Sequence, residues 1–238
     1  MIPKIIHYCW FGGKPVPLEV KKCVKSWKKL CPDYEIKQWN ESNFDVNCHP
    51  FVKAAYDAKA WAFVSDYARL KIVYENGGIY LDTDVELVKN IDFLRDTPFY
   101  IGVQQEPHVC ATGLGFGAEK NNLIVREMME EYDNISFSLE KQSLIACPYL
   151  NNKVMERRGF KYSSDIIKTD QMLILPPKMM DPYSPGKKTE NLFSDETVSI
   201  HHYSASWETK RVVLKRKIIR CLGPKHINNI KRILRYGK

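Results

Sequence analysis

Hydrophobic and polar positions along the chain predict an ordered series of strands and helices. Residues 4–11 form a run rich in isoleucine and aromatic side chains that ends at two glycines, which predicts a buried strand leading into a loop. Residues 18–30 repeat apolar positions at helical spacing and stop before Pro32, as a helix should. Residues 34–39 alternate and predict a second strand. Strand, helix and strand in this order indicate an α/β unit.

The longest regular pattern begins at residue 54. Residues 54–76 contain neither glycine nor proline and repeat apolar side chains at helical spacing. Two glycines then end the predicted helix, and residues 79–81 form a short apolar strand. Asp82 and Asp84 follow directly at the carboxyl end of that strand. Open α/β sheets bind ligands at this end of their strands, so this position favours a functional role for the acidic pair.

The last part of the chain differs in charge from the rest. Residues 210–238 carry 11 Lys and Arg but no Asp or Glu, which leaves 25 basic against 28 acidic residues in positions 1–209. We therefore expect one α/β domain over residues 1–209 and a tail of two short basic amphipathic helices over 210–238. The tail could complete the fold, but we favour binding to an anionic membrane surface, where each Lys or Arg adds about 1 kcal/mol.

Composition excludes several classes of protein. The 238 residues are 44% hydrophobic and 27% charged, which is typical of a globular chain and not of a disordered one. No apolar run is long enough to cross a membrane, and the first residues predict a strand instead of a signal peptide. Seven cysteines without a C-x-x-C spacing argue against a disulfide framework or a thiolate zinc site. For these reasons we expect a cytoplasmic protein. We also expect no binding to nucleic acid, because the tail lacks interleaved aromatic side chains.

Two pairs of charged residues could carry chemistry. Asp82 and Asp84 could turn toward one Mg²⁺ or Mn²⁺ ion, although a solvated loop explains the same pair. Asp66 and Arg69 share a helix face at i, i+3 spacing. They could form a local ion pair, or they could present a polar face to a phosphate or a hydroxylated ligand.

Aromatic and histidine residues provide two further candidates. Trp10 follows the first strand beside two glycines and could be a core residue or a plate on which a flat base stacks. His201 or His202 could supply a third ligand to Mn²⁺, or could be an ordinary surface or core residue. The indole N–H of Trp207 could donate a hydrogen bond to a phosphate.

Together these motifs resemble glycosyltransferase family 32, whose sugar-binding region contains a D-x-D motif. The resemblance rests on residues 2–12, on the sequence Ser-Asp-Tyr-Ala-Arg at 65–69 and on Gly-Gly-Ile-Tyr-Leu-Asp-Thr-Asp at 77–84. The family includes yeast initiating mannosyltransferases and bacterial capsule transferases, and it is distantly similar to the large glucosylating toxins. The resemblance implies an α/β fold of GT-A type, a nucleotide-binding sandwich with a mixed central sheet. It also implies a nucleotide-sugar donor, an Mn²⁺ or Mg²⁺ ion and retention of anomeric configuration.

Residue by residue, the resemblance assigns the donor-binding roles. Trp10 would stack on the nucleotide base, and Tyr80 would lie beside the nucleotide. Ser65, Asp66 and Arg69 would hold the ribose, the diphosphate and the donor sugar. Asp66 and Arg69 are therefore expected to take part in catalysis.

The same resemblance assigns the metal-binding roles. Asp84 would bind the metal directly and count as catalytic, while Asp82 would contact the ribose or the metal. His202 stands five residues before Trp207, where related transferases carry a C-terminal metal ligand, and His201 is the adjacent alternative. Trp207 would donate to the β-phosphate.

The resemblance also implies a reaction and a setting. The donor is expected to be a UDP-sugar, with GDP-mannose as an alternative, and the acceptor a glycan or a lipid-linked saccharide in capsular or O-antigen synthesis. The enzyme would work at the inner face of the plasma membrane. A cation can neutralise the departing nucleotide diphosphate, so no protein acid is needed there. Retention without an obvious carboxylate nucleophile favours front-face attack. Gln105, Glu106 and His108 lie in a loop that we place on the acceptor side.

Other functions are less well supported by the sequence. A phosphatase of the haloacid-dehalogenase type needs Thr or Val where Glu86 stands, and a later acidic pair that is absent. No G-x-G-x-x-G follows the first strand, which argues against a dinucleotide oxidoreductase. A non-catalytic protein that binds sugar nucleotides or a membrane remains the alternative, although the complete set of motifs argues against a degenerate site.

Overall fold

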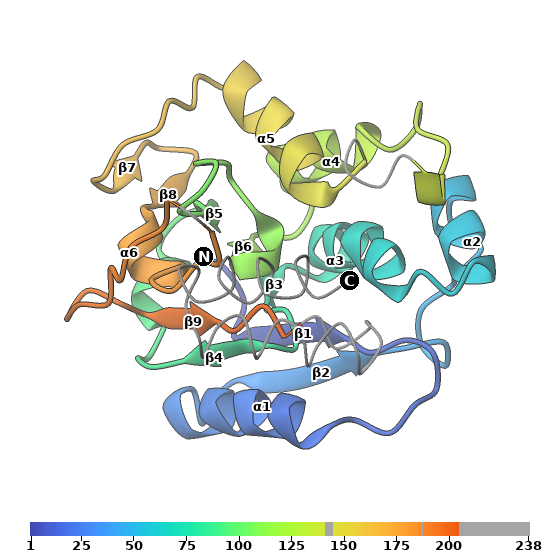
Figure 1. The fold of residues 1–238 in the computed structure, drawn as a ribbon, viewed down its shortest axis with the longest axis horizontal. Coiled ribbons are helices and arrows are strands. Elements are labelled where there is room, and N and C mark those ends of the chain that lie inside the picture. Colours follow the sequence, from blue (N-terminus) through green and yellow to red (C-terminus); the bar gives the residue numbers. More distant parts are fainter. Residues whose placement is uncertain (141–144, 187, 205–238) are drawn as a thin grey trace, which may run out of the picture.

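The computed structural model describes residues 1–140, 145–186 and 188–204, and these are built around a mixed sheet. Its seven strands lie in the order β2-β1-β3-β6-β5-β8-β7 (Figure 1). β1 is parallel to β2 and β3, whereas β6 runs antiparallel to both of its neighbours. The strands are β1 (Ile5–Cys9), β2 (Glu35–Trp39), β3 (Gly78–Tyr80), β5 (Phe99–Gly102), β6 (Phe116–Ala118), β7 (Ile167–Lys168) and β8 (Leu173–Leu175).

Two hydrophobic clusters lie on opposite faces of this sheet. Successive side chains of a strand point to opposite faces, so Phe99 and Ile101 enter one cluster and Tyr100 enters the other. The first cluster contains α2 (Pro50–Asp57), α3 (Trp61–Asn76), α4 (Leu123–Glu130) and α5 (Cys147–Arg157). The second contains α1 (Leu18–Leu30), α6 (Pro177–Met180) and β4 (Val85–Leu87), which pairs with β9 (Ser199–His201) in a separate antiparallel sheet. The predicted α/β class with a mixed central sheet is confirmed.

The helix predicted over residues 54–76 is in fact two helices. α2 ends at Asp57 and α3 begins at Trp61. Between them Lys59 adopts a left-handed conformation with φ of +56°. The new helix start lets the indole of Trp61 pack on Gly12, where an added Cβ would lie only 2.7 Å from Trp61 Cε2. Neither glycine nor proline marks the break, so the sequence pattern does not predict it.

Part of the sequence prediction falls outside the described residues. The tail helices over 210–238 and the phosphate-binding role of Trp207 belong to this part and remain predictions. Within the described part of the chain, every helix is too short or too polar to cross a lipid bilayer. The cysteines described there are free thiols.

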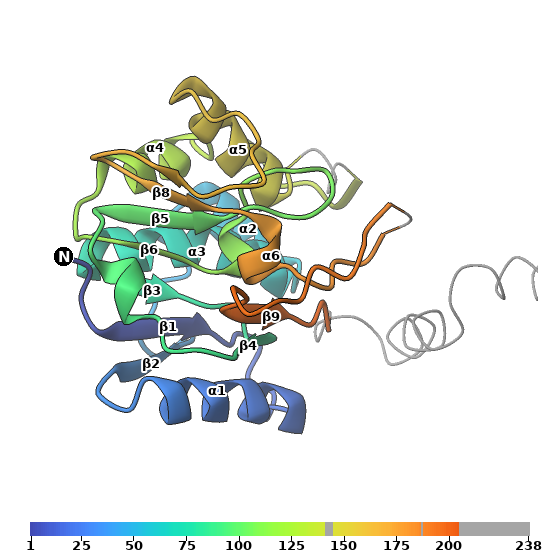
Figure 2. The ribbon, with the colours of Figure 1, turned by 90° about the vertical axis from the view of Figure 1, so that its left-hand side faces the viewer.

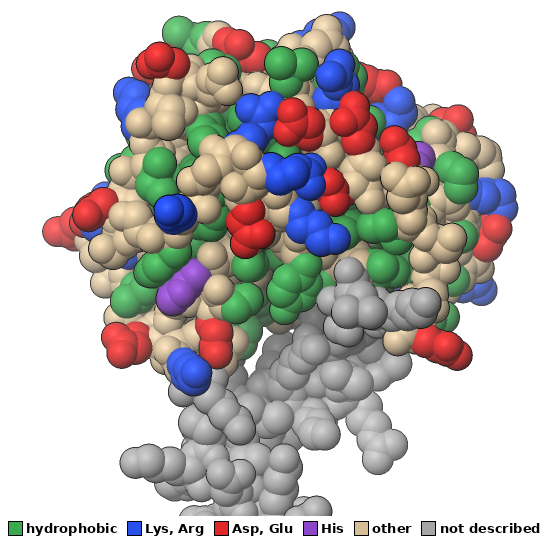
Figure 3. All heavy atoms as spheres, turned by 90° about the horizontal axis from the view of Figure 1, so that it is seen from above, with side chains coloured by type: hydrophobic (Ala, Val, Ile, Leu, Met, Phe, Trp, Pro, Cys, Tyr) green, Lys and Arg blue, Asp and Glu red, His purple; other side chains and the backbone are tan. Residues whose placement is uncertain are grey.

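The outer surface of α4 and α5 carries charges of both signs. Figure 3 shows Lys and Arg interspersed with Asp and Glu over this face. Arg158 Nη2 lies 2.7 Å from Glu127 Oε1, and Arg157 Nη2 lies 2.6 Å from Glu131 Oε1. Such a mixed surface is typical of a solvated face.

His7 is a buried histidine in β1 whose ring nitrogens both have partners. Trp39 Nε1 donates to His7 Nδ1 at 3.1 Å, so His7 Nε2 carries the proton and donates to the Gly77 carbonyl oxygen at 2.9 Å. Gly78 leaves room for the ring, because a Cβ there would lie 2.9 Å from His7 Nε2. Burial lowers the pKa of His7 to about 4.

We expect His7 to make folding sensitive to mild acid. Its ordinary pKa of 6.5 applies to the unfolded chain, so the unfolded chain binds the extra proton first as the pH falls below 6.5. The free energy of unfolding therefore decreases as the pH falls from about 6.5 towards 4, and it is about 2 kcal/mol lower at pH 5. An NMR titration of the imidazole signals measures this pKa directly. A His7 pKa near 6.5 in the folded protein would contradict the account.

Candidate functional site

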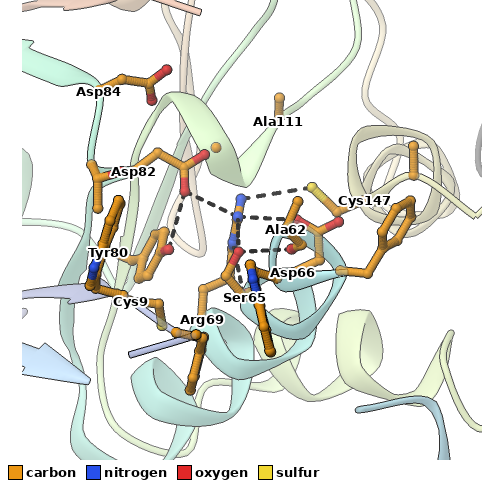
Figure 4. A pocket seen from close by; sticks show the side chains of 18 of the residues that line it. Cys9, Ala62, Ser65, Asp66, Arg69, Tyr80, Asp82, Asp84, Ala111 and Cys147 are labelled. Carbon is orange, nitrogen blue, oxygen red and sulfur yellow. Dashed lines mark hydrogen bonds and ion pairs between the residues drawn. The ribbon is translucent and has the colours of Figure 1, made fainter. Parts of the chain in front are cut away.

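A cavity of about 1450 Å³ opens beside the carboxyl ends of β1 and β3. It is lined by nearly all the described residues that the sequence singles out, and Figure 4 shows several of them from close by. The exceptions are His202 and the three acceptor-side residues Gln105, Glu106 and His108, which do not line it. The lining includes Trp10, Ser65, Asp66, Arg69, Tyr80, Asp82, Asp84 and His201. The cavity is large enough for a nucleotide-sized ligand.

Three potential metal ligands converge at one side of the cavity. Ligand atoms of Asp82, Asp84 and His201 all lie within 4.8 Å of one another. β4 pairs with β9 so that Val85 lies opposite His201, and this pairing brings the histidine to the acidic pair. His201 Nε2 lies 3.1 Å from Asp84 Oδ1. Two carboxylates and one imidazole form a donor set that fits Mn²⁺, and Mg²⁺ less well because Mg²⁺ prefers oxygen ligands.

The structure brings His201, and not the predicted His202, to this group. His202 Nε2 lies 2.8 Å from Glu86 Oε2, on the neighbouring strand. β9 ends at His201, and His202 directly follows it with its side chain turned to Glu86 instead of Asp84. Sequence spacing alone does not reveal which histidine faces Asp84.

The charges of the three groups depend on one another. Burial opposes ionisation of Asp84, but the His201 imidazole and the backbone N–H of Ser204 outweigh it and lower the pKa of Asp84 to about 2. Burial, reinforced by the charge of Asp84, raises the pKa of Asp82 to about 6 although Arg69 opposes the shift. Burial also opposes protonation of His201, but Asp84 outweighs it and raises the pKa of His201. The group therefore concentrates negative charge that a bound cation would neutralise.

Arg69 lies between two acidic side chains on the cavity wall. Its Nη2 is 3.0 Å from Asp66 Oδ1 and 3.0 Å from Asp82 Oδ1, and its side chain is only 4% exposed. The guanidinium also lies over the ring of Tyr80, 4.9 Å from the ring centre. Figure 4 shows this arrangement, with the Asp84 carboxylate lying apart from the guanidinium. The local ion pair predicted with Asp66 therefore exists, and Arg69 extends it to the D-x-D sequence.

The polar residues around Arg69 fix one another. Ser65 accepts through its carbonyl oxygen from Arg69 Nε at 3.1 Å and through its hydroxyl oxygen from Nη2 at 3.3 Å. Tyr80 donates its hydroxyl to Asp82 Oδ1 at 3.1 Å. Donors and acceptors are therefore held in place before any ligand binds.

Trp10 is a partly buried residue of the cavity wall. Its indole N–H donates to the Lys14 carbonyl oxygen at 2.6 Å, which fixes the ring. Trp61, which packs on Gly12, is a second indole in the cavity wall. In the sequence Trp61 is only one apolar position of a helix pattern, because its place in the cavity wall depends on the helix break that precedes it.

Cys147 is a cavity residue that sequence reasoning misses. It is the first residue of α5, and its Sγ lies 3.8 Å from Arg69 Nη1 and 3.8 Å from Thr112 Oγ1. Burial raises the pKa of this thiol well above its ordinary value, so it is neutral. A single cysteine with no motif around it gives no signal in the sequence.

Comparison with known proteins shows what part of the chain is similar to. Residues 17–100 match the family described as "Glycosyltransferase sugar-binding region containing DXD motif". Inositol phosphoceramide mannosyltransferase 3 of Schizosaccharomyces pombe (strain 972 / ATCC 24843) is 31% identical over 119 residues, which cover 48% of this chain and 33% of that protein. An uncharacterized glycosyltransferase of Acanthamoeba polyphaga mimivirus is 37% identical over 101 residues, which cover 40% of each protein. The matches thus span between a third and two fifths of these relatives.

The fold agrees with a solved glycosyltransferase. The PaToxG glycosyltransferase superposes with a TM-score of 0.52 at 19% identity, over 66% of this chain and 70% of that one. The predicted GT-A type of fold, with its mixed central sheet, is thereby confirmed. Residues 17–100 are therefore similar to the D-x-D-containing sugar-binding region of glycosyltransferases.

Proposed function

We propose that this protein is a metal-dependent, retaining glycosyltransferase that moves a hexose from a nucleotide sugar to a glycan or lipid-linked acceptor. The observation that carries the proposal is the convergence of Asp82, Asp84 and His201 at the edge of a large cavity that Arg69 and Trp10 also line. A diphosphate needs a cation and a guanidinium, and a nucleoside base needs a flat apolar surface. The cavity offers ligands for a cation, a guanidinium and a flat aromatic ring.

The reaction we propose breaks the bond between the donor sugar and the nucleotide diphosphate. Asp82, Asp84 and His201 would hold a divalent ion, which neutralises charge on the departing diphosphate. Arg69 is held rigidly by its acidic neighbours and would orient the diphosphate and the donor sugar. Trp10 would hold the base, and the walls of the cavity would keep water from the sugar carbon.

Retention is best explained by attack from the side that the nucleotide leaves. A covalent mechanism needs a free carboxylate as nucleophile. Asp66 and Asp82 each lie 3.0 Å from Arg69, and Asp84 lies 3.1 Å from His201, so each has a partner in the cavity. These contacts favour front-face transfer, in which the acceptor hydroxyl attacks as the bond to the diphosphate breaks and the departing diphosphate takes up the hydroxyl proton.

The donor, pathway and location belong to the same proposal. We expect a UDP-sugar, while the mannosyltransferase names of two relatives favour GDP-mannose as the other candidate. Capsular or O-antigen synthesis would supply a lipid-linked acceptor at the inner face of the plasma membrane. The basic residues of 210–238 would bind the anionic lipid surface there.

Calorimetry with a panel of UDP- and GDP-sugars tests the proposal. We expect one donor to bind in the presence of Mn²⁺ and to lose most of its affinity in EDTA. The matching nucleoside diphosphate should bind as well, because the base and the diphosphate supply most of the contacts. If no nucleotide sugar binds with Mn²⁺ present, the membrane-associated alternative replaces this proposal. Binding without any release of nucleotide would instead favour the non-catalytic protein that binds sugar nucleotides.

The two adjacent histidines provide a matched pair of variants. His201→Ala should weaken Mn²⁺ binding about tenfold or more, because it removes one of three ligands. His202→Ala should leave Mn²⁺ affinity within about twofold, since the imidazole of His202 contacts the Glu86 carboxylate and not the carboxylates of Asp82 and Asp84. Electron paramagnetic resonance of free Mn²⁺ measures both affinities. The opposite order of effects would return the ligand role to His202.

A further inference from the structure

The chain between β5 and β6 forms a hairpin that begins and ends at the cavity. Gln104 and Ala111 both line the cavity, and Val103 pairs with Cys110 in an isolated antiparallel bridge. Gln104 N–H donates to the Val109 carbonyl oxygen at 2.9 Å, which closes the hairpin. We call residues 104–110 the rim hairpin. Its tip must project from the cavity edge, because both of its ends lie there.

Exposed aromatic side chains form two parallel pairs beside this hairpin. The rings of His108 and Tyr162 stack at 3.7 Å between centres with 12° between planes. Those of Tyr183 and Phe193 stack at 5.8 Å and 5°. Tyr162 is 45% exposed and Phe193 is 49% exposed, so stacking leaves much of each ring open to solvent. We call these four residues the rim aromatics.

One glutamine joins the two pairs into a single structure. Gln105 Nε2 donates to the Glu190 carbonyl oxygen at 3.0 Å, and Glu190 N–H donates back to Gln105 Oε1. The backbone N–H of Gln105 donates to the buried carboxylate of Asp181 at 2.8 Å. The rim hairpin is thereby tied to the segment that carries Tyr183 and Phe193. In Figure 2 this orange segment and the green rim hairpin both extend to the same side of the sheet.

We propose that the rim hairpin and the rim aromatics form the acceptor subsite, and that its ligand is a saccharide. The inference rests on the proposed function and names the acceptor class for the same cavity. One face of a hexose ring presents only C–H groups, which pack on the electron-rich face of an aromatic ring. A group of exposed rings marks a ligand-binding surface more often than a single exposed ring does. Glu106, exposed at the hairpin tip, can accept hydrogen bonds from sugar hydroxyls.

The position of the rim hairpin next to the donor cavity favours an acceptor subsite over an unrelated sugar-binding site. Gln104 lies in the cavity wall and Gln105 is the next residue, so the subsite is continuous with the donor cavity. A glycan bound along the rim aromatics can therefore place one hydroxyl inside the cavity. The rings are held before binding by their stacking and by Gln105, which lowers the entropic cost of ordering them.

Two variants and one matched control test the subsite. Tyr162→Ala and Phe193→Ala each remove one exposed ring, while Phe93→Ala removes a phenylalanine that is also 49% exposed. Phe93 lies in the 3₁₀ helix Asp92–Arg95, which precedes β5, whereas the rim hairpin follows it. The acceptor probes are octyl α-mannoside, octyl β-glucoside and octyl β-galactoside. Hydrolysis of the donor, in which water takes the place of the acceptor, reports on the donor site alone.

We expect Tyr162→Ala and Phe193→Ala to raise the KM for an octyl glycoside about tenfold. Donor hydrolysis should stay within about twofold in both variants, and Phe93→Ala should change neither quantity. Saturation-transfer NMR of the donor-loaded protein should show sugar C–H contacts that disappear in Tyr162→Ala.

Unchanged KM values in both variants would overturn the subsite, as would the absence of NMR contacts for all three glycosides. Failure of the wild-type protein to bind any donor would instead overturn the proposed function.

Discussion

Asp84→Asn should remove most of the metal affinity and lower nucleotide release from the donor by about a hundredfold or more. Asparagine keeps the shape of the side chain and can still accept from the Ser204 N–H, which donates to Asp84 Oδ2 at 2.7 Å. It loses the charge that faces His201, so the protein should remain folded while the cation binds poorly. Calorimetry with Mn²⁺ and the release assay measure the two effects separately.

Glu86→Gln is the matched control for this variant. Glu86 lies two residues further along the chain, and its carboxylate contacts His202 outside the cavity lining. This variant should bind Mn²⁺ and release nucleotide as the wild-type protein does, within about twofold. A folded Asp84→Asn protein with ordinary Mn²⁺ affinity and turnover would refute the metal assignment.

Arg69→Met should cause the largest loss of stability among single changes at the site. It leaves the buried carboxylate of Asp66 and the partly buried carboxylate of Asp82 without the guanidinium that lies 3.0 Å from each. Removal of one partner from a buried ion pair costs about 3–5 kcal/mol, because the remaining charge has no compensation. Urea unfolding measures the loss, and nucleotide release should fall in the same variant because the diphosphate loses its guanidinium.

The control is Arg126→Met on the exposed side of α4. Arg126 Nε lies 3.3 Å from Glu130 Oε1, and both side chains are more than half exposed. An exposed pair of this kind contributes little, so the change in unfolding free energy should stay below about 1 kcal/mol. If Arg69→Met and Arg126→Met unfold at the same urea concentration, the buried charge network does not hold the site together.

Local patterns predict much of the fold, because they depend on residues close in sequence. The predicted helix over residues 18–30 coincides with α1, and the apolar run before Asp82 is β3. The break between α2 and α3 is not predicted, because it depends on Trp61 packing against a glycine nearly 50 residues earlier. Local periodicity contains no information about such a distant contact.

The candidate site, too, is predictable from the sequence only in part. Trp10, Asp66, Arg69 and Asp84 are found from sequence because they stand in compact motifs, and the structure brings them to one cavity. The choice of His201 depends on the pairing of β4 with β9, two strands of three residues that lie far apart in the chain.

The rim aromatics are still harder to predict from the sequence. They lie at positions 108, 162, 183 and 193, and tertiary contacts alone bring them together. Of these, sequence reasoning places only His108 on the acceptor side, and it gives no reason to join it with Tyr162.

The central claim is that Asp82, Asp84 and His201 hold the cation of a bound nucleotide sugar. The most direct test is an anomalous diffraction map at the manganese edge, from crystals grown with Mn²⁺ and the nucleoside diphosphate that calorimetry selects. The account predicts one strong peak between these three side chains, with the diphosphate beside Arg69 and the base at Trp10. A peak elsewhere, such as between Glu86 and His202, or a nucleotide bound outside this cavity, would contradict it.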